Sequence, residues 1–98
     1  MFIITLTYKQ PLEVVEQYLV AHRTFLEEGY VNNYFVASGP QNPRTGGIII
    51  ACLRDKKILA DLLQRDPFYI HGIADYQIAE FIPVKFHKNF EYFLNLPQ

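Results

Sequence analysis

The stretch PLEVVEQYLVAHRTFLEEG, residues 11–29, has the apolar periodicity of an amphipathic helix. His22 falls in the single gap of the apolar stripe, which predicts a titratable imidazole on the buried face of that helix. Pro11 suits a first helical turn, because its missing N–H would be unpaired there, and Gly29 is a typical helix end. The stripe itself consists of residues at helical spacing: Leu12, Val15, Leu19 and Leu26.

A second informative stretch is Asp66-Pro67-Phe68. Pro67 disfavours the helical conformation at the residue before it, so a helix capped by Asp55 should end near Arg65. Asp66 then has three interpretations: a turn residue, the N-cap of a brief helical turn that starts at Pro67, or the partner of His22. A local pairing with His71 is a rival to the last of these.

Four strands are predicted around these helices from β-branched and aromatic residues and their alternation. Pro83 indicates that the last strand lies at a sheet edge. The order strand, helix, strand, strand, helix, strand predicts an α+β fold of the ferredoxin-like βαββαβ type, an antiparallel sheet with two helices on one face. The predicted strands are residues 2–8, 30–38, 48–53 and 73–86, with a turn-rich loop over 39–47.

Both faces of this predicted sheet carry apolar side chains, whereas a sheet with one face in water should alternate with polar residues. A second copy of the chain would cover the free face, so we expect a face-to-face homodimer. The chain divides into a domain of residues 1–86 and a C-terminal aromatic tail of residues 87–98. The tail is expected to form a short helix and is an alternative cover for part of that face.

Composition narrows the possible functions of this 98-residue chain. A formal charge of −1 without long runs of one sign indicates no nucleic-acid partner. The longest apolar run, residues 48–53, is too short to span a membrane, and the lone Cys52 fits a reducing, cytoplasmic location. No cofactor motif is present, and the histidines lack the spacing of a metal site, so neither a cofactor nor a metal is expected.

A histidine on an apolar face is usually structural, but a carboxylate beside it would change what the ring can do. The carboxylate selects one ring tautomer and stabilises the charged imidazole, whereas burial favours the neutral ring. A pair of His22 and Asp66 would therefore be suited to moving a proton near a carbonyl or to activating water.

Several residues could bind a substrate near this pair, although each has an ordinary alternative. Ser38 ends a predicted strand just before Gly39 and Pro40, where a hydroxyl and backbone N–H groups could bind an oxyanion or simply form a turn. Arg23 and Arg44 could clamp a carboxylate or remain solvated at the surface. Phe68 could line a pocket, although a core position is the favoured interpretation for it, as for Tyr8, Tyr34 and Tyr76.

Four short motifs follow one another along the chain: His22-Arg23-Thr24-Phe25-Leu26, Ala37-Ser38-Gly39-Pro40, Gly46-Gly47-Ile48-Ile49-Ile50, and Asp66-Pro67-Phe68 with Gly72. Taken together, they resemble the YciI-like (YCII-related) domain family. The resemblance covers residues 1 to about 86. It implies a ferredoxin-like dimeric α/β-barrel domain with His22 and Asp66 as the active-site pair and a serine-glycine turn at Ser38 and Gly39. The related superfamily includes small enzymes that act on ring lactones and on hydroxylated or chlorinated aromatics without a metal or organic cofactor.

The leading hypothesis is a small cofactor-independent enzyme in which His22 acts as general acid or base and Asp66 orients it. Its substrate would be small, aromatic or lactone-like, and the reaction an isomerisation, elimination or hydrolysis. The alternatives are a non-catalytic small-molecule-binding or regulatory dimeric domain, and a structural dimerisation module that has no open pocket beside His22.

Overall fold

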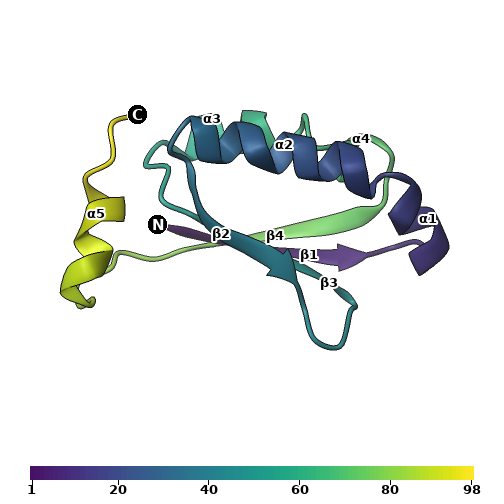
Figure 1. Cartoon of the computed structure of the whole chain (residues 1–98), viewed down its shortest axis with the longest axis horizontal. Helices are drawn as coiled ribbons and strands as arrows, with labels where there is room; N and C mark the ends of the chain where they lie inside the picture. The colour runs from purple at the N-terminus through teal and green to yellow at the C-terminus, as the bar shows by residue number, and fades with distance from the viewer.

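A four-stranded antiparallel sheet with helices packed on one face forms the body of the computed structural model, which describes residues 1–98. The strand order is β2-β3-β1-β4, and Figure 1 shows α2, α3 and α4 above the sheet. The α+β, ferredoxin-like arrangement predicted from the sequence is confirmed. The strands are β1 (Phe2–Tyr8), β2 (Phe35–Pro40), β3 (Gly46–Ala51) and β4 (Ala74–Glu80). The helices are α1 (Leu12–Gln17), α2 (Leu19–Val31), α3 (Lys56–Leu63), α4 (Pro67–Ile70), η1 (Lys88–Phe90) and α5 (Glu91–Leu94).

The core lies between the sheet and the helices. β1 runs through the middle of the sheet, and its alternate residues Phe2, Ile4 and Leu6 are fully buried on the helix side. Each buried apolar side chain of this size contributes about 1.5–3 kcal/mol relative to exposure. On the helical side, Leu59 of α3 and Phe68 of α4 complete the packing.

The prediction of one helix over 11–29 was wrong in two respects. The helix is divided at Tyr18, whose φ of −109° and ψ of 3° leave the helical range and whose ring stacks on His71. Such a tertiary contact overrides local helix periodicity. Gly29 does not end the second helix, which continues to Val31; a Cβ at Gly29 would lie 2.2 Å from the Phe35 ring, so the glycine allows close packing.

The predictions of three strands were also corrected. β3 spans Gly46–Ala51 rather than residues 48–53, and β2 ends at Pro40 rather than residue 38, so Ser38 and Gly39 lie within a strand and not in a turn. β2 begins at Phe35 rather than residue 30, because α2 extends further and Asn33 turns the chain with a φ of 64°. β4 ends at Glu80 rather than residue 86, because its neighbour β1 begins at Phe2, and the last backbone contact joins Phe81 to the Met1 carbonyl. β4 does lie at the sheet edge, as Pro83 indicated, and Asp55 caps α3 as predicted.

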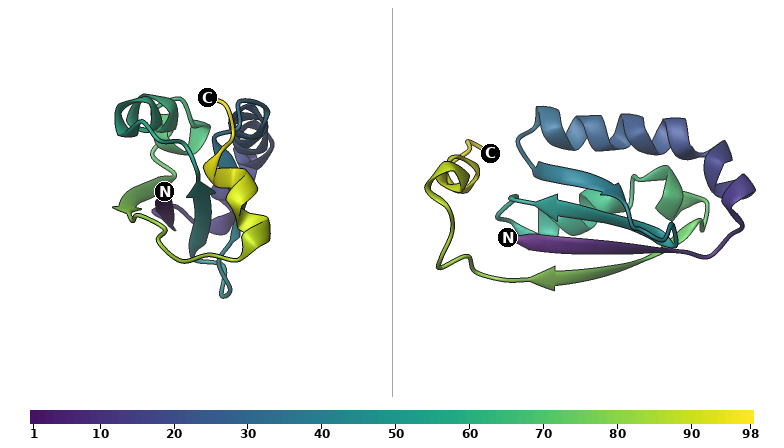
Figure 2. Two further views of the ribbon diagram at one scale, coloured as in Figure 1. Left: turned by 90° about the vertical axis from the view of Figure 1, so that its left-hand side faces the viewer. Right: turned by 60° about the horizontal axis from the view of Figure 1, so that its bottom comes forward.

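The second face of the sheet is not covered by any other part of the chain. Figure 2 shows α5 beyond the end of the sheet rather than over that face. Arg54 donates to the carbonyls of Leu94 and Leu96, and Gln98 donates to the Cys52 carbonyl, which anchors the tail there. The alternative in which the tail covers part of the open face is therefore wrong. No helix has the length and apolar character needed to cross a membrane.

Candidate functional site

His22 and Asp66 lie in contact although 44 positions separate them in the sequence. The Nδ1 atom of His22 is 2.8 Å from Oδ1 of Asp66, and both side chains are buried. α2 carries the histidine on its sheet-facing side, and the carboxylate stands at the start of α4. The packing of α2 beside α4 therefore produces the contact between the two side chains.

Asp66 receives three hydrogen bonds. Its Oδ1 accepts the N–H of Phe68 at 3.0 Å as well as His22, and its Oδ2 accepts the hydroxyl of Tyr76. Asp66 is thus the N-cap of α4 and the partner of His22 at once, so two of the sequence interpretations hold together. The Phe68 N–H and the Tyr76 hydroxyl donate to this carboxylate, so Asp66 is the acceptor in both of these contacts. An acceptor oxygen beside the His22 ring favours the tautomer with its proton on Nδ1.

Tyr76 was expected to be a core residue, and its contact with Asp66 was not predicted. It lies on the helix-facing side of β4, aligned with Leu6 of β1. Burial, and then the charge and hydrogen bond of Asp66, raise the pKa of Tyr76 above its ordinary value of about 10. One signal was available in the sequence: a tyrosine with buried parity needs a polar partner for its hydroxyl.

The free edge of the His22 ring faces open space. Its Nε2 has no hydrogen-bond partner within the protein. Because no fully buried side-chain nitrogen or oxygen lacks a hydrogen-bond partner, Nε2 must be accessible. The ring is stacked on Phe68, with centroids 4.0 Å apart and an interplanar angle of 1°. The imidazole is therefore held at Nδ1 by Asp66 and on its ring face by Phe68, and Nε2 is available to a ligand.

A cavity of about 650 Å³ adjoins this ring. Leu6, Leu19, Leu26 and Ile49 form apolar parts of its wall. The structure also places there every substrate-binding candidate named from the sequence, namely Arg23, Ser38, Gly39, Pro40, Arg44 and Phe68. Proximity does not assign them a binding role, which stays a prediction.

The Ser38 hydroxyl lies 2.7 Å from the hydroxyl of Tyr30, a partner that the sequence did not indicate. Arg44, which lines the same cavity, donates to Glu16 at 3.0 Å. The hydrogen bonds of Arg44 to Glu16 and then to Tyr8 hold the pKa of this guanidinium above its ordinary value, so it stays charged. Glu16 and Tyr8, which also line the cavity, were not predicted as site residues.

The rival pairing of Asp66 with His71 that was considered from the sequence does not form. His71 stacks on Tyr18, with ring centroids 4.4 Å apart, and makes no hydrogen bond to Asp66. No group of three or more His, Cys, Asp or Glu side chains is placed to hold a metal ion.

Comparison with known proteins gives the family. The profile of the YCII-related domain matches residues 1–82, most of the chain. The chain belongs to the YCII-related domain family. This confirms the resemblance drawn from the sequence motifs, all of which lie within the matched residues. None of the curated proteins matches this family member.

A solved structure resembles this YCII-related chain in fold. It is the 5-chloro-2-hydroxyhydroquinone dehydrochlorinase of Burkholderia phenoliruptrix AC1100, in complex with 2,5-dihydroxybenzoquinone. The two structures superpose with a TM-score of 0.69 at 18% sequence identity, over 84% of this chain and 94% of the other. At that identity the likeness shows a common fold.

Proposed function

We propose that this YCII-related protein is a cofactor-independent acid–base enzyme in which His22 moves a proton of a small cyclic substrate. One observation carries the proposal: the buried His22–Asp66 pair leaves Nε2 free at the wall of a cavity of about 650 Å³. A cavity of that volume is typical of small-molecule sites. Because such an open cavity adjoins His22, the purely structural module is the weaker interpretation.

The proposed reaction begins with His22 as base. Its Nε2 lone pair removes a proton from a carbon next to a carbonyl, and the electron pair of the broken C–H bond passes to the carbonyl oxygen as an enolate. Asp66 stabilises the imidazolium that forms and keeps Nδ1–H in place. The enolate then expels a leaving group, or it takes the proton back at another position. The first outcome is an elimination and the second an isomerisation.

The enolate oxygen needs a hydrogen-bond donor. Ser38 supplies a hydroxyl in the same cavity, and Tyr30 can donate to its oxygen while Ser38 donates to the ligand. An oriented donor of this kind stabilises developing negative charge more than a hydroxyl that must reorganise first. Ser38 is therefore proposed as the oxyanion donor rather than as a nucleophile.

The fold neighbour supports an elimination. It is a dehydrochlorinase bound to a dihydroxybenzoquinone, so this fold accommodates a ring substrate and the loss of a leaving group. Hydroxylated or chlorinated aromatics and small lactones are accordingly the proposed substrate range, and hydrolysis of a lactone remains part of the proposal.

A homodimer is part of the same proposal. Ile3, Ile48 and Ile50 lie on the sheet face opposite the helices and are only partly buried in the single chain. A second copy packed on this face would remove them from water. Sedimentation that shows only monomer at micromolar concentration would contradict it. We also propose a cytoplasmic location, supported by the free thiol of Cys52.

The test is turnover by matched variants. The wild-type protein is incubated with a panel of chlorinated hydroquinones and small lactones, and products are separated by mass spectrometry. For a substrate found in this way, His22→Gln should lower kcat by about 10²–10⁴-fold, the usual contribution of a general base. His87→Gln, an exposed histidine in the tail, is the control and should not change kcat. Equal turnover by His22→Gln would contradict the proposal, and binding without conversion would indicate the non-catalytic alternative.

A further inference from the structure

The charged side chains of the cavity are mostly basic. Arg23 and Arg44 line it together with His22, and Glu16 is the one acidic residue of the wall. Asp66 stands behind His22 with its acceptor oxygens occupied, so it is not offered to a ligand. The whole chain has a formal charge of −1, so this basic character belongs to the cavity and is not a property of the whole surface.

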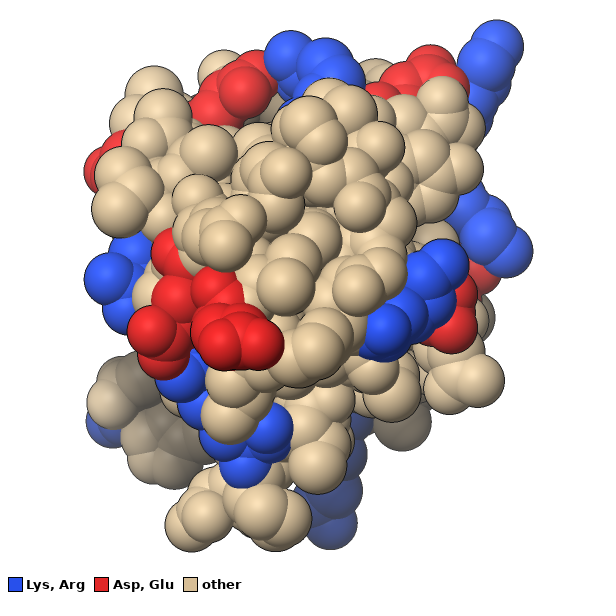
Figure 3. Space-filling view, turned by 90° about the vertical axis from the view of Figure 1, so that its right-hand side faces the viewer, with Lys and Arg blue, Asp and Glu red and all other residues tan.

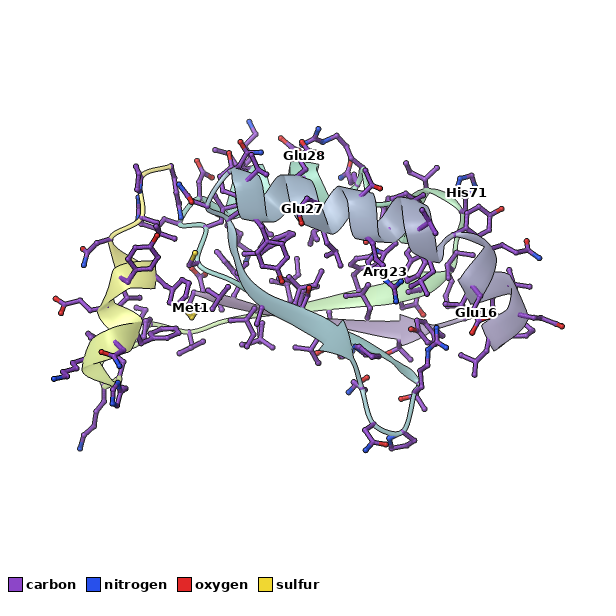
Figure 4. All side chains as sticks on the ribbon, viewed as in Figure 1. Met1, Glu16, Arg23, Glu27, Glu28 and His71 are labelled. Carbon is purple, nitrogen blue, oxygen red and sulfur yellow. The ribbon has the colours of Figure 1, made fainter.

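Arg23 has no anionic partner within the protein. The four ion pairs of the chain do not include it, and it makes no side-chain hydrogen bond. Glu27, one helical turn further on, does not pair with it, and Glu28 is held by Arg65 at 2.9 Å. Figure 4 shows the Arg23 side chain below α2, on the side that faces the sheet. A guanidinium placed beside the cavity without a partner is available to a ligand.

Arg44 adds a second guanidinium at the α1 end of the cavity. It comes from the turn between β2 and β3, and its contact with Glu16 of α1, 3.0 Å long, holds it in place. Figure 3 views this end of the molecule, where charged side chains surround a central uncharged surface. Glu16 is more than half exposed, so the Arg44–Glu16 pair is solvated, and exchange of Glu16 for the acid group of a ligand has a small free-energy cost.

The rest of the wall limits the ligand to one with an apolar body. Leucine and isoleucine side chains from β1, α2 and β3 line the same cavity as the arginines and the His22 ring. Guanidinium groups bind carboxylates through paired, charge-assisted hydrogen bonds, and the apolar wall favours a hydrocarbon or aromatic remainder.

We propose that the cavity selects a small organic carboxylate, with an apolar body against the leucine and isoleucine wall and its acid group bound by Arg23 and Arg44. This inference rests on the proposed function for the location of the site, but not on proton transfer. It gives the substrate an anchor separate from the atoms that react at His22. Correct placement of a substrate by such an anchor contributes to the rate of the chemical step.

The experiment compares charged and neutral probes of matched shape. Benzoate is titrated against benzamide, and 3-phenylpropionate against 3-phenylpropionamide, with the chemical shifts of ¹⁵N-labelled protein as the readout. Each carboxylate should bind at least about tenfold more tightly than its amide, because hydrogen bonds to charged groups contribute that much. The difference should shrink as salt is added, since the arginines are partly solvated.

Three variants assign the preference to residues. Arg23→Gln should weaken carboxylate binding about tenfold and leave amide binding unchanged. Arg44→Gln should act in the same direction, and Glu16→Gln should tighten carboxylate binding up to about fivefold by freeing Arg44. Arg65→Gln is the control, because Arg65 pairs with Glu28 and does not line the cavity. Arg23 makes no ion pair with any of the chain's carboxylates, so we expect Arg23→Gln to fold.

The outcomes separate this inference from the acid–base proposal. Equal binding of acid and amide, binding of neither, or carboxylate binding unchanged in both arginine variants would overturn the inference. His22→Gln should still prefer the carboxylate. Turnover of a neutral substrate that depends on His22, without any carboxylate preference, would overturn this inference alone. A carboxylate preference in a protein without catalytic activity would overturn only the proposal that the protein is an acid–base enzyme.

Discussion

Phe68 holds His22 in place twice, once through its ring and once through Asp66. The two rings are stacked with centroids 4.0 Å apart, and the Phe68 N–H donates to the same Asp66 oxygen that binds His22. The orientation of the imidazole is therefore built into the first turn of α4. Pro67 begins that turn, in which the Phe68 ring contacts His22 and the Phe68 N–H donates to Asp66.

Replacement of Phe68 should make the His22 ring more mobile in a protein that still folds. Phe68→Leu removes the stacked ring but keeps the N–H, and we expect a loss of stability of at least about 0.5–1.5 kcal/mol, the contribution of an aromatic pair. Urea unfolding measures this loss, and the ring proton signals of His22 should broaden. Phe86→Leu, at an exposed site, is the control and should leave both unchanged. An unchanged His22 ring in Phe68→Leu would show that stacking does not fix it.

Asp66 should tolerate asparagine far better than alanine. Asp66→Ala leaves His22, Tyr76 and the Phe68 N–H without their acceptor and should cost about 3–5 kcal/mol in free energy of unfolding. Asp66→Asn keeps a cap and an acceptor, so it should retain most of the stability while removing the charge that supports an imidazolium. Thermal unfolding of both variants checks the order. Equal stability would mean that Asp66 contributes little as a shared acceptor.

Tyr76 should make the folded state sensitive to alkaline pH. Its raised pKa means that the folded chain keeps the phenol proton where the unfolded chain has released it. The stability from this group is therefore complete below pH 10 and is lost as the pH rises beyond that value. Tyr76→Phe should be less stable at neutral pH by about 1–3 kcal/mol, because Asp66 loses a donor, and should lose less stability above pH 10.

The control for this titration is Tyr92→Phe, at an exposed tyrosine of the tail. It should keep the alkaline fall of the wild-type protein. Unfolding by urea across the pH range, followed by circular dichroism, gives the curves. If Tyr76→Phe and Tyr92→Phe show the same fall above pH 10, the buried hydroxyl is not its source.

Gly29→Ala should destabilise the protein, although alanine favours helices by about 1 kcal/mol over glycine. The added Cβ would lie 2.2 Å from the buried Phe35 ring, and overpacking of this kind costs about 1–3 kcal/mol. Gly39→Ala, where a Cβ meets no atom within 4 Å, is the matched control. Differential scanning calorimetry of both variants is sufficient. A higher Tm for Gly29→Ala would show that the ring moves freely.

Local patterns predicted the elements that depend on nearby residues. The alternation of residues 2–8 gave the exact bounds of β1, and Asp55 caps α3 through the N–H groups of Lys57 and Ile58. The order of the elements was enough for the ferredoxin-like topology, because that topology joins neighbours with short connections. The contact of His22 with Asp66 was one of several interpretations that the sequence left open, and the resemblance to the YCII-related family favoured it.

Features that depend on distant contacts could not be read in this way. The break at Tyr18 accompanies a stack on His71, and the extension of α2 past Gly29 depends on the position of Phe35. Neither contact leaves a periodic signal. The donor role of Tyr76 depends on the alignment of β4 with β1, which the sequence does not state. Tyrosines whose place in the alternation of a strand puts them on its buried face are therefore useful candidates for hydrogen-bond donors in such sites.

The most direct test of the acid–base assignment is the protonation of the two His22 ring nitrogens, measured by long-range ¹H–¹⁵N correlation spectroscopy of the labelled protein. At a pH where the ring is neutral, the proton should reside on Nδ1, in the hydrogen bond to Asp66, and the Nε2 signal should shift when a ligand fills the cavity. A neutral ring with its proton on Nε2, unaffected by ligand, would contradict the account.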